Sequence, residues 1–206
     1  MTERIGLFGG SFDPVHNAHV ALARAALQTL SLDELRWVPA GQPWQKARTM
    51  ASAQHREAMV RLAIAGEPRF VLDRVEIERA GPSFTLDTVR DLQAARPGVE
   101  CYLLIGADQY AGLHTWHGWP ELLGRVVLAV ANRPGAVPPA HPDVQAQSSH
   151  AVPLPMIDIS STDIRRRVAR GEVISELVPP AVARYIAQHG LYLEPTQAPQ
   201  SAAAGS

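Results

Sequence analysis

The opening of the chain places two glycines and two histidines around a single turn. Gly9 and Gly10 follow an apolar run, and His16 and His19 stand beside the start of an amphipathic helix. Adjacent glycines let the backbone bring bare N–H groups close to a bulky anion, and a helix N-terminus favours negative charge. We expect Gly9-Gly10 to form a tight turn and Asn17 to cap the helix. The stretch therefore predicts a binding site for a polyanion such as a triphosphate.

This turn does not match the common alternatives. Its histidines lack the Glu and the four-residue spacing of a metalloprotease helix, and no Cys or third His lies nearby to complete a zinc site. The stretch matches neither a P-loop nor a GxGxxG fingerprint. Local physics leaves open one other interpretation, a structural turn with histidines on the surface.

A second helix start, late in the chain, offers hydroxyls and a cation. Ser160, Ser161 and Thr162 stand at this start, Asp163 fits a capping box with Ser160, and Arg165 follows. Taken alone, the segment is typical of a well-capped surface helix with a basic face. Ligand-binding groups of an open parallel sheet gather at the carboxyl ends of its strands, so we expect both helix starts at that edge.

Several single residues are further candidates. Lys46, the only lysine, lies in a proline-containing loop, where a compact charge on a flexible stem suits contact with an anion. Asp108 comes just past the carboxyl end of an apolar strand and so is expected to face the crevice. Thr85 or the neighbouring Ser83 is expected to cap a helix. Trp116 suits either a stacking surface or cover for a hydrophobic edge.

The hydrophobic pattern predicts alternating strands and helices without internal repeats. This order indicates an α/β fold with a doubly wound parallel sheet of Rossmann-like type. Strands are expected at 4–8, 35–39, 70–72, 75–77, 101–105 and 125–130, helices at 17–30, 52–65, after 81–85, after 160 and at 179–190, and a long loop at 136–152.

Size and composition narrow the class of protein. At 206 residues, the chain suits one domain over 1–194, followed by a tail at 195–206 whose composition predicts disorder. A net charge of −1 argues against a nucleic-acid partner. The single cysteine, Cys101, indicates a buried thiol and a reducing compartment. Without a leader or a membrane-spanning stretch, we expect a cytoplasmic protein. A homo-oligomer is compatible with the sequence.

With both helix starts in view, the chain resembles the nicotinate-mononucleotide adenylyltransferases, within the wider nucleotidyltransferase superfamily. An HxGH-type turn stands here as His-Asn-Ala-His at 16–19, with Ala18 in place of the usual glycine, and an ISSTxIR-type helix start stands at 159–165. The likeness extends through 83–88, 105–108, Trp116, 133–135 and 178–192. The middle motifs point to the pyridine-nucleotide branch.

The resemblance implies a role for each matching position. It implies a nucleotidyltransferase fold in which His16, His19 and Arg165 act on the triphosphate. It implies that the nicotinate and the mononucleotide phosphate are bound by Lys46, Thr85, Trp116, the backbone of His117 and Arg133. The implied ATP-binding residues are Gly9, Gly10, Ser11, Phe12, His16, His19, Gly106, Asp108, Ser160, Ser161, Thr162 and Arg165.

The implied activity is transfer of AMP from ATP to nicotinate mononucleotide, giving deamido-NAD and pyrophosphate. Magnesium is expected to arrive bound to the triphosphate, because this ion usually binds through substrate phosphates and few protein ligands. Two alternatives remain at this point. One is a related transferase whose acceptor is nicotinamide mononucleotide or phosphopantetheine, and the other is a nucleotide-sensing module without turnover.

Overall fold

The computed structural model describes residues 2–41, 50–132, 139–153 and 159–193. Within them, one six-stranded sheet has the order β3-β2-β1-β4-β5-β6, and every neighbouring pair is parallel. This is the strand order of a doubly wound sheet, whose order reverses between β1 and β4 and so opens a crevice at their carboxyl ends. The strands are β1 (Arg4–Gly10), β2 (Glu34–Pro39), β3 (Phe70–Leu72), β4 (Glu100–Gly106), β5 (Val127–Asn132) and β6 (Ser149–Pro153).

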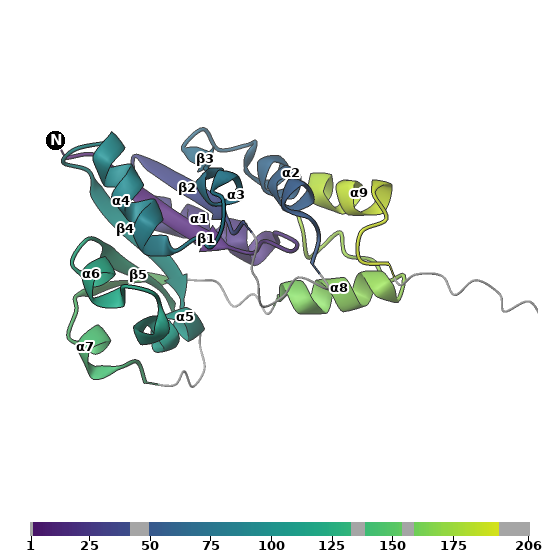
Figure 1. The fold of residues 1–206 in the computed structure, drawn as a ribbon. Coiled ribbons are helices and arrows are strands. Elements are labelled where there is room, and N and C mark those ends of the chain that lie inside the picture. The colour runs from purple at the N-terminus through teal and green to yellow at the C-terminus, as the bar shows by residue number, and fades with distance from the viewer. Residues whose placement is uncertain (1, 42–49, 133–138, 154–158, 194–206) are drawn as a thin grey trace, which may run out of the picture.

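Helices cover both faces of the sheet (Figure 1). One face carries α1, α2, α8 and α9, and the other carries α4, α6 and α7. The bounds are α1 (Asn17–Thr29), α2 (Ala53–Ile64), α3 (Val75–Glu78), α4 (Thr85–Ala95), α5 (Ala107–Gly112), η1 (Leu113–Thr115), α6 (Trp119–Leu123), α7 (Pro142–Gln145), α8 (Ser161–Ala169) and α9 (Pro180–Gln188).

Two hydrophobic cores form because successive side chains of a strand point to opposite faces. In β4, Tyr102 and Leu104 join the core beneath α1, whereas Leu103 and Ile105 join the core beneath α4. Each central strand is thus buried on both sides, which explains its near-continuous apolar sequence. The Rossmann-like arrangement predicted from the sequence is confirmed.

Two sequence predictions of secondary structure were wrong. Residues 75–77 form the one-turn helix α3 rather than a strand, because three alternating residues also fit one helical turn. The span 136–152, expected to be a loop, contains α7 and most of β6. β6 is an edge strand with one buried side chain, Val152, so its sequence carries little apolar signal.

Capping and turn chemistry also differ from the expectations. His16 rather than Asn17 is the N-cap of α1, and the Asn17 side chain donates a hydrogen bond to the Glu176 carbonyl at 3.0 Å. Phe84 rather than a hydroxyl residue stands at the N-cap of α4, and the Ser83 hydroxyl accepts a hydrogen bond from Arg79. In the opening turn, the residue with positive φ is Phe12, at 48°.

No helix among the described residues is long and apolar enough to cross a membrane. The predicted tail, 195–206, lies outside the described residues.

Candidate active site

The two helix starts singled out in the sequence meet at the carboxyl edge of the sheet. The Ser161 hydroxyl of α8 donates a hydrogen bond to the Pro14 carbonyl at 2.9 Å. The Arg165 guanidinium donates another to the Asp13 carbonyl at 2.7 Å. Both acceptors belong to the turn between β1 and α1, so α8 is docked on that turn.

The start of α8 presents hydroxyl and N–H groups toward solvent. Ser160 caps the helix by accepting a hydrogen bond from the Asp163 backbone N–H at 3.1 Å. The Asp163 carboxylate pairs with Arg167. The Ser160 and Thr162 side chains are exposed, and the guanidinium of Arg165 lies within 3.4 Å of the Thr162 hydroxyl. This end of the helix therefore has the charge and the donors to bind phosphate.

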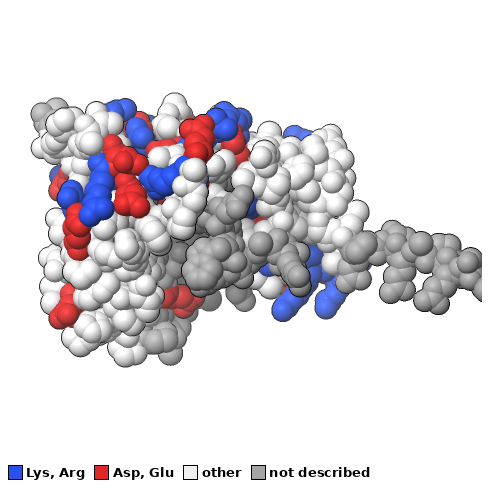
Figure 2. Space-filling model, in the orientation of Figure 1, with Lys and Arg blue, Asp and Glu red and all other residues white. Residues whose placement is uncertain are grey.

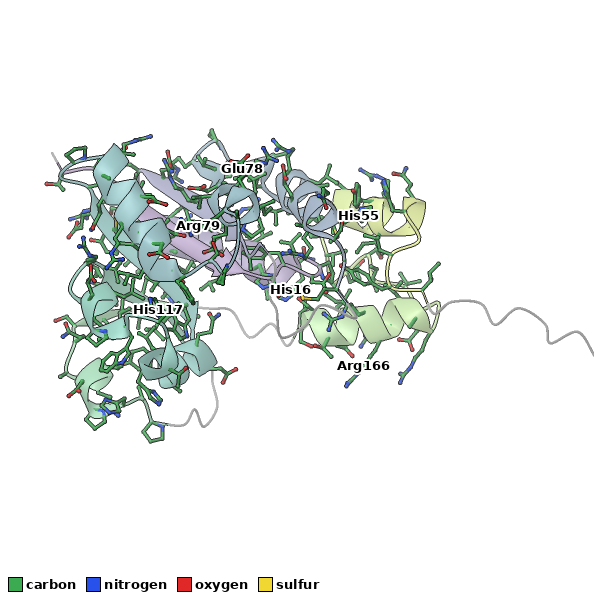
Figure 3. All side chains as sticks on the ribbon, viewed as in Figure 1. His16, His55, Glu78, Arg79, His117 and Arg166 are labelled. Carbon is green, nitrogen blue, oxygen red and sulfur yellow. The ribbon has the colours of Figure 1, made fainter. Side chains whose placement is uncertain are left out.

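The two histidines of the opening turn form a stacked pair. His16 is 4% exposed, and its ring lies 3.6 Å from that of His19, measured between ring centres. The His16 backbone N–H donates to Nδ1 of His19 at 3.2 Å, which fixes the orientation of the second ring. Figure 3 places His16 between the sheet and α8. His16 comes two residues after Pro14, the acceptor of the Ser161 hydrogen bond, so the pair adjoins the turn on which α8 is docked.

Phe12 contributes to the turn in a different way. Its side chain is 1% exposed and packs against the rings of Phe8, His19 and Trp37. The ring supports His19 from the core, so any contact between Phe12 and a ligand has to come from its backbone.

A pocket of about 310 Å³ opens next to this turn. Gly9, Gly10 and Ser11 form part of its wall, and a Cβ placed on Gly9 would meet nothing within 4 Å. The absence of a side chain therefore leaves room for a ligand. The lining residues are Leu7, Gly9, Gly10, Ser11, Val38, Ala40, Glu76, Thr85, Thr88, Leu103, Ile105, Gln109 and Trp116.

The pocket brings two of the predicted nicotinate residues, Thr85 and Trp116, together with the glycine segment. Thr85 begins α4, and the half-buried Trp116 follows η1. His117 is the next residue, and its exposed ring stacks on Phe84 with the ring centres 4.3 Å apart. The His117 ring is thus engaged by Phe84 at the start of α4.

Gly106 and Asp108 stand where β4 passes into α5. Gly106 is the N-cap of α5, and the Gln109 side chain accepts its backbone N–H at 3.2 Å. The Asp108 side chain is exposed beyond the strand end. Both residues thus lie at the carboxyl edge of the sheet. Two other predicted contacts, Lys46 and Arg133, lie outside the described residues.

Sequence reasoning missed three polar side chains of the pocket, Glu76, Thr88 and Gln109. The Thr88 hydroxyl donates to the Glu76 carboxylate at 3.3 Å, and both residues line the pocket. Burial raises the pKa of Glu76, while Thr88 and Arg79 oppose that shift. Glu76 belongs to the segment mistaken for a strand. Thr88 lay within a motif of the resemblance but carried no separate signal.

Sequence reasoning also missed a buried arginine that holds the turn in place. Arg56 of α2 is 2% exposed and donates to the carbonyl groups of Ser11, Gly41 and Ala51 at 2.9, 2.7 and 3.2 Å. Burial lowers the pKa of Arg56, and the Asp13 carboxylate opposes that shift. Arg56 therefore joins the end of β1 to the segment after β2. An arginine inside a helical pattern is ordinarily exposed, so no local pattern indicates this role.

Charges away from the site are mostly paired with one another. Figure 2 shows basic and acidic side chains interspersed around α4, where the ion pairs include Arg79–Asp91 and Arg90–Glu121. Arg166 follows Arg165 directly but points away from the body of the molecule, below α8 (Figure 3). Arg165 is thus the arginine of this pair that contacts the turn.

Comparisons with a family model and with known relatives point to the same protein family. The model of the cytidylyltransferase-like family matches residues 7–167. A probable nicotinate-nucleotide adenylyltransferase of Methylibium petroleiphilum is 52% identical over 199 residues, covering 94% of each chain. One from Bordetella petrii is 51% identical over 197 residues, covering 92% of this chain and 99% of the relative.

A solved structure shows the same fold at low sequence identity. It is the Plasmodium falciparum nicotinic acid mononucleotide adenylyltransferase complexed with NaAD. Its TM-score is 0.76 at 18% identity, and the match covers 92% of this chain and 97% of that chain. At that identity the likeness supports the architecture alone.

Proposed function

The chain belongs to the nicotinate-nucleotide adenylyltransferases of the cytidylyltransferase-like family, and we propose that the two docked helix starts form its triphosphate site. The protein transfers AMP from ATP to nicotinate mononucleotide in NAD biosynthesis, giving deamido-NAD and pyrophosphate. The observation that carries the proposed site is the pair of hydrogen bonds from Ser161 and Arg165 to the turn at 13–14.

The reaction needs little acid–base chemistry from the protein. The attacking group is a phosphate monoester whose second pKa is near ~6, so its oxygen is already ionised at neutral pH. The obstacles are repulsion between two anions and the charge that grows on the leaving pyrophosphate. Catalysis should therefore come from alignment and from cationic or N–H groups at the phosphates.

The described residues supply those groups from two sides. The α-, β- and γ-phosphates would be bound on one side by the backbone of 9–12 and by His16 and His19. On the other side they would be bound by the start of α8, with Ser160, Ser161 and Thr162. Arg165 would stabilise the departing pyrophosphate. Support comes from the contact of α8 with the turn and from the stacked histidines beside it.

The acceptor would occupy the pocket beside the turn. We assign the nicotinate ring to Trp116 and its carboxylate to the Thr85 hydroxyl and the His117 backbone, with Gly106 and Asp108 near the adenosine. Thr85 and Trp116 lining one pocket with Gly9 and Gly10 supports this placement. We retain Lys46 and Arg133 as proposed contacts of the mononucleotide phosphate.

The nucleotide substrate is ATP with a divalent metal ion, and we propose that this ion is Mg²⁺ carried by the triphosphate. Magnesium commonly binds through substrate phosphates and keeps several waters. We also propose that 1–194 is one nucleotidyltransferase domain acting in the cytoplasm.

Pyrophosphate release tests the function directly. The purified protein would receive MgATP with nicotinate mononucleotide, nicotinamide mononucleotide or phosphopantetheine. We expect release with nicotinate mononucleotide at clearly higher kcat/KM than with the neutral nicotinamide analogue, because a carboxylate strengthens hydrogen bonds from hydroxyl and N–H donors. Equal efficiency with the two mononucleotides would contradict the assigned ring site. Binding without release would indicate a sensing module.

A further inference from the structure

A buried carboxylate in the opening turn connects three distant segments. Asp13 is 1% exposed, and its Oδ1 accepts hydrogen bonds from the Ala51 backbone N–H at 3.1 Å and the Tyr192 hydroxyl at 2.7 Å. Its Oδ2 makes no hydrogen bond within the described residues and lies 3.6 Å from Nη1 of Arg165. The carboxylate thus joins the segment before α2, the segment after α9 and the arginine of α8.

The arrangement at Asp13 determines which way its carboxylate faces. With Oδ1 held by two donors, Oδ2 is directed at the Arg165 guanidinium, which also donates to the Asp13 carbonyl at 2.7 Å. Buried charges require partners, and Arg56 supplies a second positive charge nearby. The Arg165 guanidinium therefore meets Asp13 at two points, its backbone carbonyl and its carboxylate.

Tyr192 reaches Asp13 from a backbone conformation that a tyrosine rarely adopts. Its φ is 66°, in the left-handed region, four residues after α9 ends at Gln188. Burial and the neighbouring Asp13 raise the pKa of Tyr192, so its hydroxyl keeps the proton it donates. Such conformations persist where tertiary contacts hold them, and here the hydroxyl contact is with the phosphate-binding turn.

We propose that Tyr192 is a positioning residue for the pyrophosphate end of the reaction. Its hydroxyl orients the Asp13 carboxylate, and Asp13 in turn holds Arg165 toward the departing phosphates. The C-terminal segment after α9 is thereby part of the catalytic machinery, although it makes no proposed contact with substrate. This inference rests on the proposed function and on Arg165 acting at the triphosphate.

The reverse reaction separates the two ends of the site, because deamido-NAD and pyrophosphate bind as separate substrates. In Tyr192→Phe, Asp13 loses a hydrogen bond to its charged carboxylate, and we expect the KM for pyrophosphate to rise by up to about tenfold as Arg165 loses its placement. The KM for deamido-NAD should stay within about twofold of the wild-type value, since its adenosine and nicotinate contacts are elsewhere.

Tyr185→Phe is the matched control. Tyr185 lies on α9, and its hydroxyl contacts Nδ1 of His55 at 2.9 Å. Removing that hydroxyl also removes one tyrosine hydrogen bond in the C-terminal part of the chain, but it leaves the hydrogen bonds of Asp13 unchanged. The KM for pyrophosphate should be unchanged in this variant.

A second variant tests the route through Asp13. Asp13→Asn removes the negative charge beside Arg165 and should raise the KM for pyrophosphate selectively, even if Tyr192→Phe folds poorly. In the Asp13→Asn background, Tyr192→Phe should add little, because both changes act on one interaction. Melting temperatures of all variants show which are folded at the assay temperature.

Two results for Tyr192→Phe alone would overturn the inference. One is an unchanged KM for pyrophosphate in folded Tyr192→Phe, and the other is an equal rise in both KM values, which indicates general loosening. Full additivity of the two changes would likewise exclude the route through Asp13. A wild-type protein that makes no ATP from deamido-NAD and pyrophosphate would instead overturn the proposed function.

Discussion

At the scale of single residues, the site depends on side chains fixed by their neighbours. His19 stacks on His16, packs against Phe12 and accepts a backbone hydrogen bond, so its ring has one orientation. A group fixed before the substrate arrives needs little reorganisation when charge develops in the transition state. Fixed orientation is therefore the property by which His19 would act.

His19→Ala should lower kcat by roughly 10²-fold to 10³-fold, the usual cost of removing one donor that stabilises transition-state charge. Pyrophosphate release by the purified variant measures this loss. His150→Ala is the matched control, because His150 is exposed on the edge strand β6. Near-normal turnover of a folded His19→Ala protein would remove this histidine from the mechanism.

Glu76 makes a prediction about stability and pH. Burial raises its pKa, so the folded protein holds this proton more tightly than the unfolded chain does. Above the pKa that Glu76 has in the folded protein, its charged form lowers the free energy of unfolding. This loss disappears as the pH falls below the ordinary pKa of a glutamate. Glu76→Gln keeps an oxygen for Thr88 and removes the charge.

We expect Glu76→Gln to melt at a higher temperature than the wild type at pH 7 to 8, with the difference shrinking toward pH 4. Glu78→Gln is the control, since that side chain is 59% exposed and pairs with Arg74 at the surface. Thermal denaturation across this pH range measures both. A lower melting temperature for Glu76→Gln at every pH would contradict the assigned cost of burial.

At the scale of elements, α8 matters because its first turn is docked on the turn between β1 and α1. The contact uses Ser161 and Arg165, which are four residues apart and therefore share a face of the helix. Arg166, the next residue, points away from the body of the molecule (Figure 3). The helix thus presents two neighbouring arginines to different surroundings.

Replacing these arginines in turn tests the orientation of α8. Arg165→Ala should reduce kcat/KM for ATP by about 10²-fold, whereas Arg166→Ala should leave it within about twofold. Steady-state kinetics with saturating nicotinate mononucleotide gives both values. Equal losses in the two variants would mean that the basic character of α8, rather than the placed guanidinium, is what the substrate requires.

At the scale of the whole molecule, local chemistry was predicted better than distant contacts. The apolar runs and helix starts were sufficient to predict a parallel sheet and to place His16 and Ser160 at one edge. The sequence could not show that Arg56 is buried, or that Tyr192 meets Asp13, because partners far along the chain leave no local pattern. Short elements failed too, since α3 and α7 span one turn each and carry little periodicity.

The opening turn lies where the sequence predicted a site, but its glycines act differently from the prediction. The glycines continue β1, pairing with Val38 and Pro39, while Phe12 takes the left-handed conformation. What Gly9 provides is open space at the pocket wall, not the freedom to turn. The glycines predicted where the site lies, and the three-dimensional structure showed why a glycine is needed there.

The central claim is that the opening turn and the start of α8 bind one triphosphate between them. A crystal structure of the protein with a non-hydrolysable ATP analogue and Mg²⁺ tests it most directly. We predict phosphate oxygens within hydrogen-bonding distance of both His19 and the Ser160–Thr162 segment, with Arg165 at the γ-phosphate end. A triphosphate bound to only one of these segments, or elsewhere on the protein, would contradict the claim.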